Sequence, residues 1–175
     1  MECAPGLDKL LSADNLAFIQ KGISISVASR DRRLVPSLSR ALACVRSEDS
    51  TQLRLVLVAS QSQDLLRDIN AGSAVAVGFT EPSTHRTLQI KGRDARVEPL
   101  SNLDREALAR SKKAFGHEIG QLGFDDAFNQ RFFHAEPHDL VVIAFTPEVV
   151  YQQTPGPGAG GVLKPDPSGQ AEPGL

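Results

Sequence analysis

The chain has 175 residues, of which 41% are hydrophobic and 23% charged, as in a single ordinary globular domain. Its formal net charge of −2 provides no basic field for phosphate backbones, so we expect no nucleic-acid partner. Residues 1–11 lack the pattern of a signal peptide, and no apolar run approaches the roughly 20 residues that a membrane helix needs. We therefore expect a cytoplasmic protein without a membrane partner.

The first half of the chain alternates in the way that strands do. A helix is predicted around Leu7–Ile19, and a strand over Ile23–Val27, where isoleucine and valine alternate with serine. The segment Arg33–Arg46 is interpreted as a long bent strand, in which Pro36 is tolerable only near an edge, a bulge or the strand start. Leu53–Val58 follows as a third strand by the same alternation.

The middle of the chain predicts a short helix and two further strands. The helix spans Ser62–Asn70, with leucine and isoleucine side chains on one face. In Val75–Phe79, the large apolar residues Val75, Val77 and Phe79 alternate with small ones, which predicts a fourth strand. In the fifth, Leu88 and Ile90 face one way, whereas Thr87, Gln89 and Lys91 face the other.

Two helices and a last strand are predicted in the second half. Leu103–Phe115 follows Ser101 with Asp104 three residues on, which is a capping-box pattern. A shorter helix is predicted over Phe124–Phe132. Leu140–Tyr151 is nearly continuously apolar up to its proline and is interpreted as a sixth strand covered on both faces.

These elements predict a mainly β fold with flanking helices, a six-stranded antiparallel barrel. We expect one domain over residues 1–153. Residues 154–175 are rich in proline and glycine with little apolar surface to bury, so we expect a flexible C-terminal tail.

The side chains that could ligate a metal are few. Cys3 and Cys44 form no paired metal motif, and we expect both to be free thiols. His134 and His138 flank Glu136, but Pro137 disfavours the helix that would align them. We therefore predict no metal site.

The order of elements resembles a known superfamily over about Leu16–Gln153. The segments ISISVASRD, VPSLSRALAC, LRLVLVAS, SQDLLRDINAG and SAVAVGF, followed by RTLQIKGRDARV, are similar to the flavin-binding split-barrel proteins that include pyridoxamine 5′-phosphate oxidase. The resemblance implies a six-stranded split β-barrel that forms a homodimer and binds FMN between its two subunits.

The expected phosphate contacts gather before the short helix. Ser60, Gln61 and Ser62 precede Gln63, where unpaired backbone N–H groups and the helix dipole favour an anion. The other interpretation is an ordinary serine N-cap of a structural helix. The resemblance assigns cofactor contacts to this segment.

Further contacts are expected from two strands. Arg40 falls where the family has an arginine on its second strand, and a guanidinium can grip a phosphate or a flavin carbonyl through paired donors. Arg86 matches the arginine of the family's RQVRVxG-like pattern, and Thr87, Gln89 and Lys91 follow it. The same residues could instead form a solvated outer face.

The chain departs from the family at two of these places. Where the family has Ser-x-Lys at the helix start, this chain has Gln63 and Leu65, or Ser62 and Asp64 if the register slips by one. The glutamine expected after Arg86 is Thr87. Losing a charge-assisted contact weakens phosphate binding by about 1.5 to 3 kcal/mol.

Two functions follow. The first is an FMN-dependent oxidoreductase acting on a small-molecule substrate, in which the flavin carries out the redox chemistry and the protein positions it. No protein acid or base is then obligatory, and no catalytic residue is assigned. The second is a non-catalytic split-barrel module that binds flavin, haem or another flat ligand.

Overall fold

The computed structural model describes residues 6–164. Its strands form one open sheet in which every neighbouring pair is antiparallel, in the order β6-β7-β3-β2-β1-β4-β5-β8. The strands are β1 (Ser24–Arg30), β2 (Pro36–Arg46), β3 (Leu53–Val58), β4 (Val75–Thr80), β5 (Thr87–Gly92), β6 (Arg96–Glu98), β7 (Leu140–Phe145) and β8 (Val149–Gln152).

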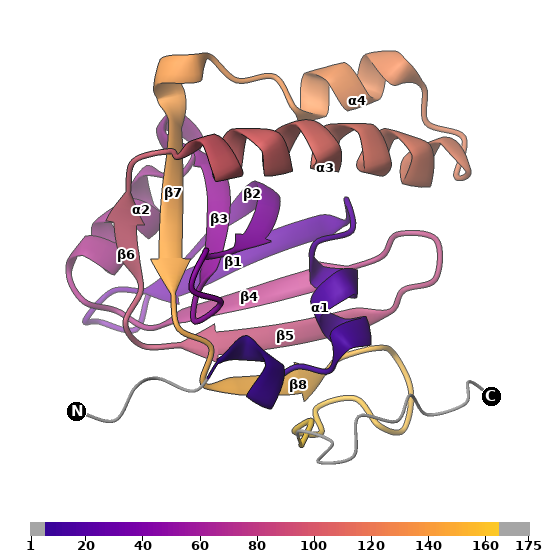
Figure 1. The fold of residues 1–175 in the computed structure, drawn as a ribbon. Helices are drawn as coiled ribbons and strands as arrows, with labels where there is room; N and C mark the ends of the chain where they lie inside the picture. The colour runs from indigo at the N-terminus through magenta and orange to yellow at the C-terminus, as the bar shows by residue number, and fades with distance from the viewer. Residues whose placement is uncertain (1–5, 165–175) are drawn as a thin grey trace.

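Helices flank this sheet, and the longest lies across one side of it with a shorter helix above (Figure 1). None of the helices within residues 6–164 is long and apolar enough to cross a membrane. The helical elements are η1 (Leu7–Lys9), α1 (Ala13–Ile19), η2 (Ala59–Gln61), α2 (Gln63–Asn70), α3 (Asn102–Gly120), α4 (Asp126–Phe132) and η3 (Pro137–Asp139).

The predicted mainly β fold with flanking helices is confirmed, but the number of strands is eight instead of six. The predicted strand Leu140–Tyr151 is two strands, because the chain breaks at Thr146–Glu148. Pro147 lacks an N–H for a sheet ladder, and the backbone N–H of Thr146 donates to the Asp94 carboxylate at 2.7 Å. The other additional strand is β6, which was not predicted and is only three residues long.

That break bends the sheet into a partly closed barrel. β7 pairs with β3, whereas β8 pairs with β5, so the two strands join distant parts of the sheet. A Cβ on Gly92 would lie 2.5 Å from the Thr146 carbonyl oxygen and 2.6 Å from a ring carbon of Phe145. Glycine is therefore required where the end of β5 passes the end of β7.

β2 carries a β-bulge between Ala41 and Ala43. Beyond it, Ala43 and Val45 pack with α3, whereas Cys44 enters the core inside the barrel. Burial raises the pKa of the Cys44 thiol, which is a free cysteine. Pro36 is the first residue of this strand, one of the places where its missing N–H is tolerated.

Three sets of apolar side chains hold the layers together. The largest fills the barrel and includes Leu55, Phe79, Ile90 and Phe145, none of which is more than 1% exposed. The smaller sets lie between the sheet and α3, where Phe115 and neighbouring side chains pack. α3 and α4 thus cover one part of the outer face of the sheet.

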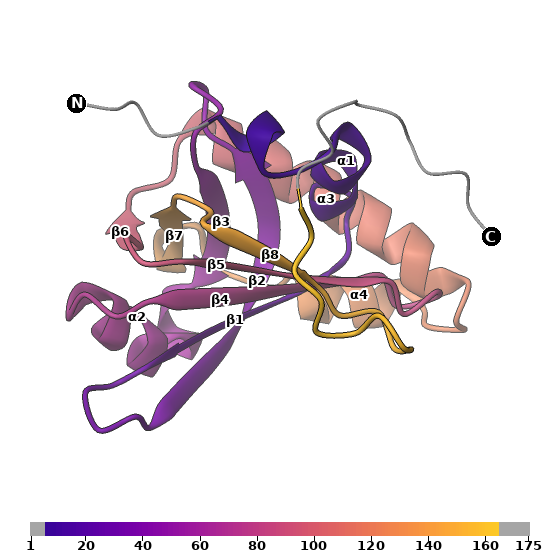
Figure 2. The same ribbon diagram turned by 90° about the horizontal axis from the view of Figure 1, so that it is seen from below.

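The first part of the predicted tail folds back along β8. The backbone N–H of Gln152 donates to the Gly161 carbonyl, and that of Leu163 donates to the Val150 carbonyl. Figure 2 shows this segment returning beside β8. The rest of the predicted tail, 165–175, lies outside the described residues, as does Cys3.

The start of α3 is fixed by a largely buried ion network. The predicted capping box is present, since the Ser101 hydroxyl accepts from the Asp104 N–H and the Asp104 carboxylate accepts from the Ser101 N–H. Arg54 donates to both oxygens of this carboxylate, at 2.9 and 2.8 Å, and also to Glu98. Asp104 is fully buried and the Arg54 side chain is 14% exposed.

We expect Arg54→Met to lower the free energy of unfolding by about 3 kcal/mol or more, because it leaves the Asp104 carboxylate buried without its cation. Urea denaturation at pH 7 measures the loss. Arg96→Met is the matched control: this arginine also pairs with Glu98 but is 51% exposed, so its loss should cost less than about 1 kcal/mol. A loss below about 1 kcal/mol in Arg54→Met, no larger than that expected of the exposed control, would show that the Arg54 network is not structural.

The same network predicts acid sensitivity. Burial by itself would raise the pKa values of Asp104 and Glu98, but hydrogen bonds, chiefly from Arg54, outweigh it and lower both. The unfolded chain therefore takes up protons before the folded protein does, and stability falls as pH drops below about 4. Unfolding measured from pH 6 to pH 2 should show this slope, and Arg54→Met should flatten it.

Candidate functional site

The predicted phosphate segment lies where β3 leads through η2 into α2. We name residues 60–62 the Ser60 corner. The backbone N–H of Ser60 donates to one oxygen of the Asp139 carboxylate at 2.9 Å, and the Ser60 hydroxyl donates to the other. Both donors of Ser60 are thus engaged by an anion that belongs to the chain itself.

Ser62 is directed into the protein. It is 3% exposed, and its hydroxyl lies 2.6 Å from that of Ser39 on β2. Ser62 is the N-cap residue of α2 by position, but its side chain makes no capping hydrogen bond. Gln61 is exposed. Of the three predicted residues, only Gln61 has a side chain facing solvent without an intramolecular hydrogen bond to the described residues.

Arg40 lies at the edge of the layer formed by α3 and α4. Its guanidinium carbon is 3.8 Å from the centre of the Phe132 ring, and it donates to the Phe132 carbonyl at 3.0 Å. Burial lowers the pKa of Arg40, and its Nε is a buried atom without a hydrogen-bond partner among the described residues. Arg40 holds the end of α4 against β2.

Arg86 is bound to α1 instead of facing a cavity. Its guanidinium donates to Asp14 at 2.5 Å and to Asn15 at 2.9 Å, and it stacks 4.2 Å from the Phe18 ring centre. Thr87 donates its hydroxyl to Thr80 on β4 at 3.1 Å. These contacts fasten the start of β5 to its neighbours.

Gln89 and Lys91 lie on the outer face, as predicted, while Leu88 and Ile90 are buried. Directly opposed residues of antiparallel strands share a face. The register therefore aligns Arg40, Ser26, Gly78 and Gln89 across four strands, with Tyr151 on β8 next in the row. At about 4.8 Å per strand, Arg40 and Gln89 are on one face but not in contact.

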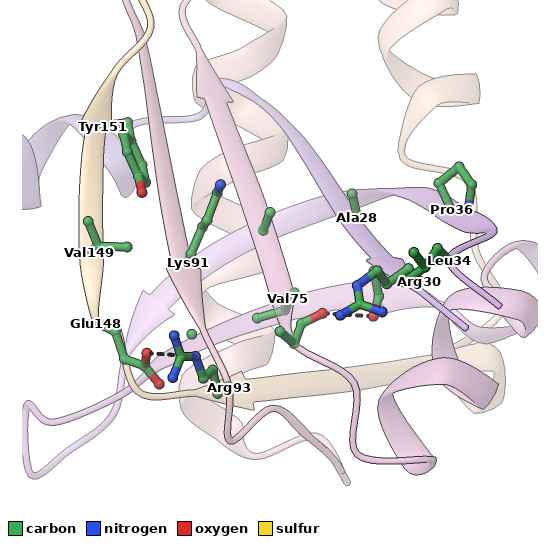
Figure 3. Close-up of a pocket in the computed structure, with 14 residues that line it drawn as sticks. Ala28, Arg30, Leu34, Pro36, Val75, Lys91, Arg93, Glu148, Val149 and Tyr151 are labelled. Carbon is green, nitrogen blue, oxygen red and sulfur yellow. Dashed lines mark hydrogen bonds and ion pairs between the residues drawn. The ribbon is translucent and has the colours of Figure 1, made fainter. Parts of the chain in front are cut away.

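This outer face holds a groove of about 580 Å³ beside Lys91. Its floor consists of small or apolar side chains from β1, β4 and β8, including Ala28, Ala76 and Val149. Figure 3 shows Tyr151 on one side of the groove, and Leu34 of the β1–β2 turn with Pro36 at the start of β2 on the other. The groove is open to solvent and lies outside the area that α3 and α4 cover.

Charged side chains line the groove unevenly. Arg30, Lys91 and Arg93 supply three cations, and Glu148 is the one acidic lining residue among those described. Glu148 lies 3.5 Å from Arg93, which leaves two cations beyond this pair. Lys91 lies 4.8 Å from the Tyr151 ring centre. The groove thus combines an aromatic surface with a net positive charge, which suits an anionic ligand with a flat, apolar body.

Of the groove residues, sequence reasoning identified only Lys91. Arg30, Arg93 and Tyr151 were missed because they come from separate strands and turns that only the folded sheet brings together. Tyr151 lies opposite Gln89 in the register of β5 and β8, on the same face as Lys91. Predicting this pairing would have required knowing that the strand breaks at Pro147.

The Ser60 corner does not fit an FMN phosphate. Its best donors are paired with Asp139 or with Ser39, and it lacks a lysine at the start of α2. The groove does fit the chemistry of an anionic flavin, since its free cations and Tyr151 offer both charge and stacking. Within residues 6–164, no group of three His, Cys, Asp or Glu side chains is arranged to hold a metal ion.

Comparisons with known proteins find relatives by structure alone. No family model matches the chain, and no curated protein matches it. A Lactobacillus delbrueckii protein, provisionally described as a pyridoxamine 5′-phosphate oxidase, is 14% identical with a TM-score of 0.51, and the match covers 82% of this chain and 94% of that one.

Two other solved structures were found by the same comparison. HupZ of Group A Streptococcus is 11% identical with a TM-score of 0.52, and the match covers 86% of this chain and 100% of that one. HutZ of Vibrio cholerae, described as a heme storage protein, is 13% identical with a TM-score of 0.46, covering 82% and 94%. At these identities, the matches with TM-scores above 0.5 show a shared fold alone.

The sheet order, the close approach of β5 to β7 at Gly92 and the two matches with TM-scores above 0.5 agree with the resemblance seen in the sequence. The chain therefore shares its fold with these two solved structures, the Lactobacillus delbrueckii protein and HupZ.

Proposed function

We propose that this chain is a ligand-binding split-barrel protein whose groove takes an anionic molecule with a flat, apolar body. The observation that carries the proposal is the placement of Arg30, Lys91 and Arg93 around an apolar floor that ends at Tyr151. A flavin such as FMN is the ligand of this class that the sequence resemblance implies.

The groove residues would each have a defined role. Tyr151 offers a ring surface for stacking, while the small side chains of Ala28 and Ala76 leave room above the sheet. Lys91 and Arg30 supply positive charge for an anionic group. FMN, when bound, would supply hydride and electron transfer through its own ring system. The protein's part would be to bind, orient and exclude water.

A homodimer belongs to this proposal. The groove opens on the uncovered sheet face, where Leu38 of β2 is 71% exposed and Leu34 in the preceding turn is 66% exposed. A second copy on this face would bury these side chains and cover the open side of the groove. This agrees with the inter-subunit ligand site that the resemblance implies.

The FMN-dependent oxidoreductase predicted from the sequence is the catalytic form of this proposal, and a carrier is the non-catalytic form. They differ in turnover alone. Oxidation of a reduced nicotinamide by the FMN-loaded protein, followed at 340 nm, would favour the enzyme, and its absence with bound FMN would favour the carrier.

We expect purified protein to bind FMN, with flavin absorbance that co-elutes in gel filtration. Lys91→Ala and Arg30→Ala should each weaken binding by about tenfold or more, because each removes a charge-assisted contact worth about 1.5 to 3 kcal/mol. Flavin fluorescence titration measures the affinities, and absorbance distinguishes a flavin from a haem.

Arg105→Ala is the matched control, since it removes one positive charge from an exposed position on α3. It should leave the affinity unchanged. If all three variants bind FMN equally well, or if the native protein binds none at micromolar concentration, the groove is not a flavin site.

We expect the native protein to sediment as a dimer and Leu38→Asp to sediment as a monomer, because a carboxylate would be buried in an apolar interface. Leu122→Asp, which changes a leucine that is 46% exposed at the end of α3, is the control and should stay dimeric. Sedimentation velocity at about 20 µM distinguishes these results. A monomeric native protein, or dimerisation unaffected by Leu38→Asp, would contradict the proposed interface.

A further inference from the structure

We propose that Asp139 supplies the anion of the Ser60 corner, so that this chain binds no ligand phosphate there. The inference is independent of the groove, because the Ser60 corner is formed by different residues, at the start of α2. It concerns the position at which the fold's resemblance to FMN-binding proteins would have placed the phosphate.

Ser60 binds the Asp139 carboxylate in the way that a loop binds a free anion, through a backbone N–H and a hydroxyl. The two oxygens of Asp139 each accept one hydrogen bond, from the Ser60 N–H and the Ser60 hydroxyl. The Ser60 hydroxyl and then its N–H, the two largest influences, lower the pKa of Asp139. The carboxylate is therefore charged at neutral pH and already occupies the donors that a phosphate oxygen would need.

The fold holds Asp139 at this place. In the β3–β7 ladder, Val58 pairs with Leu140, so Ser60 follows the end of β3 where Asp139 precedes the start of β7. The N–H of Asp139 donates to the Glu136 carbonyl at 2.9 Å, which fixes the turn of η3. An anion attached in this way competes at a high effective concentration with any free phosphate.

Other candidate donors are directed elsewhere in the fold. The Ser62 hydroxyl is paired with Ser39 beneath α2. The guanidinium of Arg40 is stacked on Phe132 and donates to the Phe132 carbonyl, although its buried Nε has no partner among the described residues. At the first positions of α2, Gln63 and Asp64 provide no cation. The anion that this corner holds is therefore Asp139, bound by both donors of Ser60.

The test uses ¹H–¹⁵N NMR of the full chain, with the backbone amide of Ser60 as the reporter. Inorganic phosphate, FMN and riboflavin are titrated separately into native protein, Asp139→Ala and the control Asp126→Ala, which removes an exposed carboxylate from α4. The native protein and the control should show no saturable shift of the Ser60 amide with any of the three.

In Asp139→Ala, the Ser60 amide should shift saturably with inorganic phosphate, with an affinity at least tenfold higher than in native protein. FMN should shift it in this variant as well, whereas riboflavin, which lacks the phosphate, should not.

Two results would overturn the inference. One is a saturable shift of the Ser60 amide by FMN or phosphate in native protein, which would show that ligand phosphate displaces Asp139. The other is an unresponsive Ser60 amide in Asp139→Ala, which would show that Asp139 is not what excludes phosphate. Failure of the groove has a different signature, because FMN would then leave the amides of Lys91 and Tyr151 unshifted.

Discussion

The structure depends on the way in which β7 and β8, separated by only three residues, pair with distant strands of one sheet. Pro147 and the hydrogen bond from Thr146 to Asp94 turn the chain between them. Gly92 at the end of β5 allows this strand to pass the end of β7, since a larger residue would collide with the backbone of Thr146. Without this crossing, the apolar side chains that fill the barrel would lie on an open, exposed sheet.

The crossing also forms the groove on the outer face of the sheet. By bringing β8 beside β5, it places Tyr151 next to Lys91 and Glu148 next to Arg93. α3 and α4 cover the other part of the outer face, where the bulge of β2 directs Leu42 and Ala43 toward them. One part of the outer face is thereby covered by helices. The remainder, which carries the groove and the exposed Leu38, is the surface on which we propose that a ligand and a second subunit bind.

Several polar residues predicted to contact a cofactor make contacts within the chain. Arg86 binds Asp14 and stacks on Phe18, and Arg40 binds the end of α4. A guanidinium is equally suited to a phosphate, a carboxylate or a ring face. Residue type and strand position therefore cannot distinguish a ligand contact from a structural one; only the partner across the fold does.

Local structure could be predicted from the order of the amino acids. Alternation predicted β3 over its full length, and Ser101 with Asp104 predicted the start of α3, because the signals lie within a few residues of one another. The order of these elements was also enough to suggest the split-barrel fold. The tertiary structure alone decided the break of the last predicted strand, the pairing of β8 with β5, and the partners of Ser60 and Arg86. Each of these depends on residues far apart in the chain, such as Asp139 beside Ser60, whose proximity follows from strand register and leaves no local trace in the sequence.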